Sequence, residues 1–319
     1  MSPSLEQRYR RALRWYPSKW RAANGDVIVG TLLDGAEGRE TPRRGELVNL
    51  AANGLLTRFS AIANLLPAGV RDRASSVALG FGTGVVLVML VVQEWAPWAT
   101  PDPYYPAPAN AIGPFHGWGG VLYCVWVVSF VLASVGASRA ARVVLATSII
   151  FAIALSGMYT DSWWLRPTNF ALAVLGALAF IVAMGNPRGF RGGRVFMLAS
   201  AIFGAGWVLV PFARNVEWTT LVTPREIWSM AVYGSGNGPM LMFWLLVFAV
   251  VAFIARKWSW FGALALLATP WVGLALATLS RQTGGGELVL AGALVAGCIV
   301  AALVILYVRG YRVAIVRRQ

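Results

Sequence analysis

The chain has 319 residues, of which 58% are hydrophobic and only 13% are charged, and its formal net charge is +14. Soluble globular proteins use roughly 25% charged residues, so this composition excludes an ordinary soluble domain. A net charge of +14 can indicate nucleic-acid binding, or it can reflect basic loops between membrane spans. The position of the basic residues relative to the apolar segments distinguishes these two interpretations.

The basic residues fall mainly on one side of the apolar segments. Of the 27 lysines and arginines, only four lie in one set of alternating loops: Arg166, Arg214, Arg225 and Arg281. This asymmetry is the positive-inside pattern of membrane proteins. We therefore expect an all-α, polytopic membrane protein, whose topology accounts for the net charge without nucleic acid.

Residues 1–73 are predicted to form a basic, helical cytosolic domain. Ser4 and Gln7 have the spacing of a capping box, which indicates a helix that ends before Pro17. A second helix is expected from Ser18 to Asp34.

A third helix is predicted between Thr41, as the N-cap residue, and Pro67, with Pro42 in its first turn. Apolar residues recur on one face of this predicted helix, and this apolar stripe must be buried against another surface. Either the three helices bury the stripe among themselves, or this helix lies on the bilayer surface.

The same segment carries motifs in which arginines and aromatic residues recur: Arg8-Tyr9-Arg10-Arg11, Leu13-Arg14-Trp15-Tyr16-Pro17, Trp20-Arg21, Gly25-Asp26 and Thr31-Leu32-Leu33-Asp34. These resemble the N-terminal helical prefix of actinobacterial membrane proteins, which are often encoded beside PadR-like transcriptional regulators and have the layout of HAAS-type signalling domains. The resemblance departs at Asn24, where such sequences often have an aromatic residue. It implies a cytosolic helical module with a regulatory or interaction role.

Residues 74–308 are predicted to hold eight transmembrane helices. The first segment, Ala74–Gln93, has no charged residue and matches the ~20 residues that span the ~30 Å apolar core of a bilayer. The other seven are Trp118–Gly136, Val143–Met158, Pro167–Gly185, Val195–Ala213, Pro239–Ala255, Trp258–Leu279 and Leu288–Val308.

The short basic connections at Arg139, Arg188 and Arg256, together with the tail of residues 309–319, mark the cytosolic side. We expect a multi-pass protein of the inner (plasma) membrane, surrounded by the lipid bilayer, with both termini in the cytosol.

The predicted spans contain no charged residue. A charge within the bilayer costs ~2.5 kcal/mol or more and is usually kept for function, so this pattern argues against a proton-coupled transporter. No phosphate-binding glycine loop is present, and we predict no cofactor or metal. The two cysteines, Cys124 and Cys298, are interpreted as apolar packing residues.

His116 is the one histidine of the chain, at the outer mouth of the second span. With Asp161 and Glu226 it defines a candidate polar site on the outer face. An acid/base pair is one interpretation. Hydrogen bonding at the membrane interface is the favoured one.

Small residues and a proline mark two of the spans. Gly80 and Gly84 form a small-xxx-small pattern, which serves either close helix packing within the chain or homo-oligomerisation. Pro270 lies inside a span and deprives the Leu266 carbonyl of its usual donor, which predicts a packing kink.

The leading functional hypothesis is a non-enzymatic membrane protein of regulatory, signalling or partner-docking type. A cytosolic protein would bind the prefix through large aromatic and charged residues, of the kind that dominate interfaces: Arg11, Trp15, Tyr16, Trp20 and Asp34. Equally, these aromatic residues could fill the core of the prefix or rest on lipid. A permease or transporter subunit is the second hypothesis, and a membrane-embedded enzyme with the outer-face site is the third.

Overall fold

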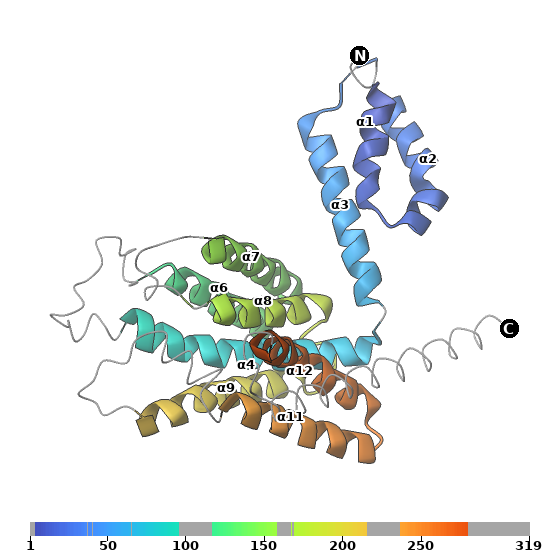
Figure 1. The fold of residues 1–319 in the computed structure, drawn as a ribbon. Helices are drawn as coiled ribbons and strands as arrows, with labels where there is room; N and C mark the ends of the chain where they lie inside the picture. Colours follow the sequence, from blue (N-terminus) through green and yellow to red (C-terminus); the bar gives the residue numbers. More distant parts are fainter. Residues whose placement is uncertain are drawn as a thin grey trace. The chain divides into compact units, whose positions relative to one another are not determined.

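Every described element of the protein is helical (Figure 1). The structure is a computed structural model, and it describes residues 4–36, 38–39, 41–64, 66–95, 117–157, 167, 169–215 and 237–279. No β-strand occurs in these ranges. The chain divides into two units, Met1–Leu66 and Pro67–Gln319, so the boundary precedes the predicted residue 73. It does so because the first long apolar helix already begins at Ala68.

The described residues of the N-terminal unit form three α-helices and one turn of 3₁₀ helix: α1 (Leu5–Ala12), η1 (Leu13–Trp15), α2 (Ser18–Asp34) and α3 (Arg44–Ala63). The predicted capping box at Ser4 is confirmed, since its hydroxyl and the Gln7 side chain each accept the other residue's backbone N–H. The prediction of Thr41 as the N-cap of α3 is wrong. The helix begins at Arg44, because Glu46 turns back and accepts the backbone N–H of Arg43.

The core of the N-terminal unit is built mainly from the first half of the segment. Its buried members are Tyr9, Leu13, Tyr16 and Val29, and partly buried side chains surround them: Leu5, Trp20, Ile28, Leu32, Leu33, Leu47 and Leu50. All three helices contribute to this cluster. The apolar stripe of α3 is therefore used at least in part within the unit, as the first of the two predicted alternatives requires.

The C-terminal unit is a bundle of apolar helices. Its described elements are α4 (Ala68–Met89) with a π-helical end, η2 (Leu90–Trp95), followed by α6 (Gly119–Val135), α7 (Ser138–Gly157), α8 (Asn169–Met184), α9 (Gly193–Asn215), α11 (Asn237–Ile254) and α12 (Trp258–Leu279). A helix thus lies at each of the first seven predicted spans. The eighth, Leu288–Val308, is outside the described residues.

Two stretches of the described helices are long and apolar enough to cross a membrane. They are Ala68–Val92 and Ser138–Gly157, with mean hydropathies of 2.2 and 1.9. Three shorter apolar helical stretches accompany them: Gly119–Val135, Ala171–Met184 and Gly193–Leu209.

Helix α4 is the centre of this bundle and contacts α6, α8, α9 and α12 (Figure 1). Its closest neighbour is α9. A side chain at Gly80 would overlap the Met197 carbonyl oxygen, and one at Gly84 would overlap that of Ala201. The two glycines therefore let the backbones of α4 and α9 touch, and the small-xxx-small pattern is used inside the chain.

Buried hydroxyl groups add polar ties between α4 and its neighbours. The Ser75 hydroxyl donates to the Val182 carbonyl of α8 at 3.0 Å, and the Ser76 hydroxyl donates to the Gly193 carbonyl at the start of α9 at 2.7 Å. Both serines are fully buried. An intramolecular hydrogen bond contributes ~0.5 to 1.5 kcal/mol net to stability.

Helix α12 continues through Pro270 without ending. Because proline has no N–H, the Leu266 carbonyl lacks its regular helical partner. The Thr269 hydroxyl donates to that carbonyl at 2.7 Å and so replaces the missing bond. A proline in an apolar helix is tolerated where a threonine supplies such a donor.

Candidate functional site

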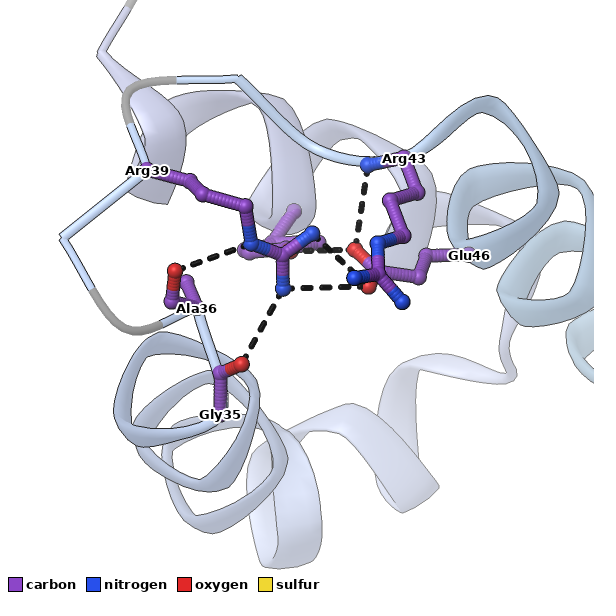
Figure 2. A network of polar contacts seen from close by, with 6 residues as sticks. Gly35, Ala36, Arg39, Arg43 and Glu46 are labelled. Carbon is purple, nitrogen blue, oxygen red and sulfur yellow. Dashed lines mark hydrogen bonds and ion pairs between the residues drawn. The ribbon is translucent and has the colours of Figure 1, made fainter.

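A polar network joins α1 and α3 at Glu46, in the first turn of α3 (Figure 2). The Glu46 carboxylate accepts a hydrogen bond from the Tyr9 hydroxyl at 2.8 Å and another from the Arg43 backbone N–H at 3.2 Å. Arg39 approaches the same carboxylate, with its Nη1 at 3.3 Å from Oε1. The carboxylate thus gathers three donors from three parts of the unit.

Arg39 also caps the C-terminal end of α2, as Figure 2 shows. Its guanidinium donates to the carbonyls of Ala36 and Gly35 at 2.9 and 3.0 Å. The last carbonyls of a helix have no partner within the helix, and a cation there also meets the negative end of the helix dipole. One arginine therefore ties the C-terminus of α2 to the N-terminus of α3.

These contacts shift two pKa values in the directions that stabilise the network. The hydrogen bond from Tyr9 lowers the pKa of Glu46 most; the Arg43 N–H and Arg39 also lower it, whereas partial burial opposes them. Burial raises the pKa of Tyr9, and its bond to Glu46 raises it further. Tyr9 therefore stays neutral and Glu46 charged near neutral pH. The network thus joins α1, the end of α2 and the start of α3.

The residues predicted to bind a partner divide between core and surface. Tyr16 is buried, and its ring stacks on that of Trp20 with centroids 4.1 Å apart, so both belong to the core of the unit. Trp15 is 49% exposed. Arg11 and Asp34 are exposed too. Of the three predicted aromatic residues, Trp15 is the one whose ring is largely available at the surface.

The backbone that carries Trp15 is held rigidly against α3. At Gly54, an added Cβ would lie only 2.8 Å from the Trp15 Cβ and 2.8 Å from the Tyr16 ring, so only glycine permits this approach. The Arg58 guanidinium donates to the carbonyls of Arg14 and Tyr16 at 2.6 and 3.2 Å. Trp15 is thus an exposed indole on a fixed backbone, which is the kind of residue that anchors protein interfaces.

Two turns of the C-terminal unit meet at the N-terminal end of α4. Asp72 accepts the Asn186 backbone N–H at 2.8 Å, which ties the α8–α9 turn to α4. The same turn reaches the α6–α7 turn, since an added Cβ at Gly136 would lie 2.6 Å from Nη1 of Arg188. Gly136 itself has φ +109°, which favours glycine.

The first turn of α12 meets the same end of α4, where an arginine contacts aromatic rings of α12 and of the α8–α9 turn. The guanidinium carbon of Arg73 lies 5.1 Å from the ring centroid of Phe190 and 5.5 Å from that of Trp260. The Phe196 ring completes the group, with its centroid 4.5 Å from that of Trp260. We call these four side chains the Arg73 cage. Cation–π contacts at this distance hold a guanidinium in place.

These turns meet at one end of the bundle, and we name this end "the basic end". Nine basic residues lie in its turns and adjoining first helical turns: Arg71, Arg73, Arg139, Arg142, Arg188, Arg191, Arg194, Arg256 and Lys257. Among the described residues of these segments, Asp72 is the single acidic one. Basic loops that the sequence separates by over a hundred residues are therefore neighbours in the fold.

A cavity of about 250 Å³ lies between α4, α8, α9, α11 and α12. Its lining is apolar apart from one serine: Val77, Phe81, Leu178, Ala199, Ser200, Phe203, Leu241, Leu245, Leu267 and Trp271. The aromatic rings of Phe81 and Trp271 pack edge to face, with their centroids 5.8 Å apart. Such a lining suits an apolar ligand.

Glu94 is a buried acidic residue that directly follows the first predicted span, Ala74–Gln93. It is 4% exposed, and its carboxylate accepts the Gly117 backbone N–H at 2.7 Å, just before α6. A carboxylate is stabilised at a helix N-terminus, so Glu94 ties the end of α4 to the start of α6. The signal that could have found it is its position directly after an uninterrupted apolar run.

The candidate outer-face residues, His116, Asp161 and Glu226, lie outside the described residues, as does Cys298. Cys124 is in α6 and forms no disulfide with a described residue. Within the described ranges, no group of three or more histidine, cysteine or acidic residues could hold a metal ion.

Comparisons of the chain with models of known protein families, with curated proteins and with solved structures give no match.

Proposed function

We propose that the chain is an eight-span protein of the inner (plasma) membrane whose N-terminal unit is a cytosolic module that docks a protein partner. The observation that carries the proposal is the exposed Trp15, fixed on its backbone beside arginines at the surface of a unit with its own core. Both termini would lie in the cytosol. The module would then act as a regulatory or signalling element, as the resemblance to HAAS-type prefixes implies.

The apolar exterior of the bundle supports the membrane placement. Large hydrophobic side chains stand exposed on several helices, including Ile150 at 71%, Ile202 at 75% and Ile254 at 73%. Apolar surface this extensive is rare on soluble monomers. The gathering of nine arginines and lysines at the basic end fits the positive-inside rule and supports a cytosolic location for that end.

The charge of the N-terminal unit supports a partner with an acidic face. Arg11 and Arg14 are exposed on either side of Leu13, next to Trp15. An indole flanked by arginines combines the residue types that dominate interface energetics. Tyr16 and Trp20 contribute indirectly, because their stacked rings support the segment that carries Trp15.

The test is affinity capture of the full-length protein from detergent-solubilised membranes, comparing wild type with Trp15→Ala plus Arg11→Ala. We expect the double variant to lose a specific cytosolic protein while its thermal stability is unchanged. Val27→Ala is the matched control, because Val27 is 70% exposed on α2 and should not affect capture. No specific capture by wild type, or equal loss with Val27→Ala, would contradict docking through Trp15.

A further inference from the structure

Arg73 is held firmly by its neighbours, yet part of its hydrogen-bonding capacity is unused. Its Nη1 donates to the Gly69 carbonyl at 2.8 Å. Its Nε is buried and has no hydrogen-bond partner among the described residues. The rings of Phe190 and Trp260 fix the guanidinium from the side. A guanidinium held in one orientation places a fixed positive charge, which attracts the phosphate of an anionic headgroup.

The Arg73 cage and the apolar cavity lie along one continuous face of the bundle. On α4, Phe81 follows Arg73 by eight residues, or about two turns, which corresponds to ~12 Å. On α12, Leu267 and Trp271 follow Trp260 at helical spacing. The Arg73 cage therefore lies at one end of this face, and the cavity lining lies at the other end. We call the face between them, including both ends, the track.

Helix α9 provides the outer edge of the same track. Phe196 of the cage is 42% exposed, and Phe203 of the cavity lining is 47% exposed. Ala199, between them on the same face, is exposed as well and also lines the cavity. The neighbouring Ile202 is 75% exposed. The cavity edge thus belongs to the apolar exterior, from which a hydrocarbon chain can enter.

We propose that this track binds one anionic glycerophospholipid of the surrounding bilayer, with its phosphate at the Arg73 cage and a segment of an acyl chain in the cavity. The volume of about 250 Å³ lies below the range of ~300 to 1,000 Å³ of small-molecule sites, so the cavity takes part of a chain. The surplus of positive charge at the basic end complements an anionic headgroup. The inference rests on the membrane placement proposed above.

The membrane placement is tested first, by sedimentation of the membranes after an alkaline carbonate wash. Release of the protein into the supernatant would overturn the membrane placement itself. The lipid site is tested next by native mass spectrometry of the full-length protein in detergent, with phosphatidylglycerol or phosphatidylcholine of the same acyl chains. Retention of phosphatidylglycerol over phosphatidylcholine by wild type supports the site, and equal retention in membrane-embedded protein overturns the site alone.

Variants separate the headgroup end from the chain end. Arg73→Gln should reduce the preference for phosphatidylglycerol about tenfold, as loss of one charge-assisted contact predicts. Arg191→Gln is its control, because Arg191 is exposed in the same basic end. Equal losses in the two variants would indicate a diffuse charge effect and overturn the assigned site. If Arg73→Gln fails to fold, Arg73→Lys, which keeps the charge without the planar fork, should show a smaller loss of the same preference, and an unchanged preference there contradicts the site.

The chain end has its own pair of variants. Ala199→Phe, which fills the cavity edge, should lower retention of both lipids, whereas Ala173→Phe on the exposed face of α8 should not. Unchanged retention in Ala199→Phe would exclude the cavity as the chain site. Excess inorganic phosphate should not displace phosphatidylglycerol, because the acyl chain contributes to binding. Full displacement would identify a free-phosphate site and overturn the proposal of a lipid.

Discussion

Replacement of Gly84 by alanine tests whether backbone contact between α4 and α9 holds the bundle together. The added Cβ would overlap the Ala201 carbonyl oxygen and lie 2.7 Å from the Ala205 nitrogen. Both neighbours are backbone atoms of a helix, so relief requires the two helices to separate. Overpacking of this kind costs ~1 to 3 kcal/mol.

Two other glycines calibrate that magnitude. Gly206 of α9 and Gly176 of α8 have no atom within 4 Å of an added Cβ. Alanine there should stabilise the helix by ~0.5 to 1 kcal/mol, because glycine loses more conformational freedom on folding. The same gain applies to Gly84→Ala, so its expected net loss is ~0 to 2.5 kcal/mol, with a middle value of ~1 kcal/mol.

The assay is thermal unfolding of the purified full-length protein in one detergent, followed by tryptophan fluorescence. At ~2 to 4 °C per kcal/mol for a unit of this size, Gly84→Ala should melt ~2 to 4 °C below wild type at the middle value, and ~10 °C below it at most. Gly206→Ala and Gly176→Ala should melt at or above the wild-type temperature. If Gly84→Ala proves as stable as Gly206→Ala, the close packing of α4 against α9 is refuted.

Two further predictions concern hydrogen bonds. Because the folded pKa of Glu46 lies below its usual 4.5, the network stabilises the N-terminal unit above that pH and loses its effect as the pH falls through the lowered value. The isolated residues 1–66, followed by circular dichroism, should therefore melt at lower temperature as the pH drops, and an equally steep dependence in Glu46→Gln would show that other groups cause it. In α12, Thr269→Val should cost ~1 kcal/mol in wild type but little in a Pro270→Ala background, where the Leu266 carbonyl regains its backbone donor. Purely additive effects in that double-mutant cycle, measured by thermal unfolding, would exclude the compensating role of Thr269.

Features that depend on neighbours in the sequence could be predicted well. The capping box at Ser4 and Gln7 acts over three residues, and the helix Ser18–Asp34 lies between Pro17 and Gly35, so local chemistry determines both. The third helix was predicted correctly, but Thr41 was wrongly predicted as its N-cap. Glu46 caps the start of α3 instead, and a glutamate that folds back onto the preceding backbone N–H leaves a weaker sequence signal than a threonine followed by proline.

The candidate sites depend on contacts between distant segments, which the sequence does not show. Trp15 and Trp20 look alike in an arginine-rich segment, yet only the stacking of Trp20 on Tyr16 separates a core residue from an exposed one. Similarly, Arg73 was the last residue of the predicted N-terminal domain and had no predicted role of its own. Its contacts are with Phe190 and Trp260, which lie far later in the chain and pack beside it only in the folded protein.

The serine bonds of α4 have a consequence for the order in which the protein is assembled. Ser76 donates to a carbonyl 117 residues later in the chain, and ribosomes need on the order of ten seconds to make that length. During this interval α4 is already synthesised, while α9, which packs most closely against it, is not. Its hydroxyl groups can meanwhile bond to carbonyls of their own helix, one turn back. Helix α4 is thus the first helix of its unit to be made and among the last to be fully enclosed.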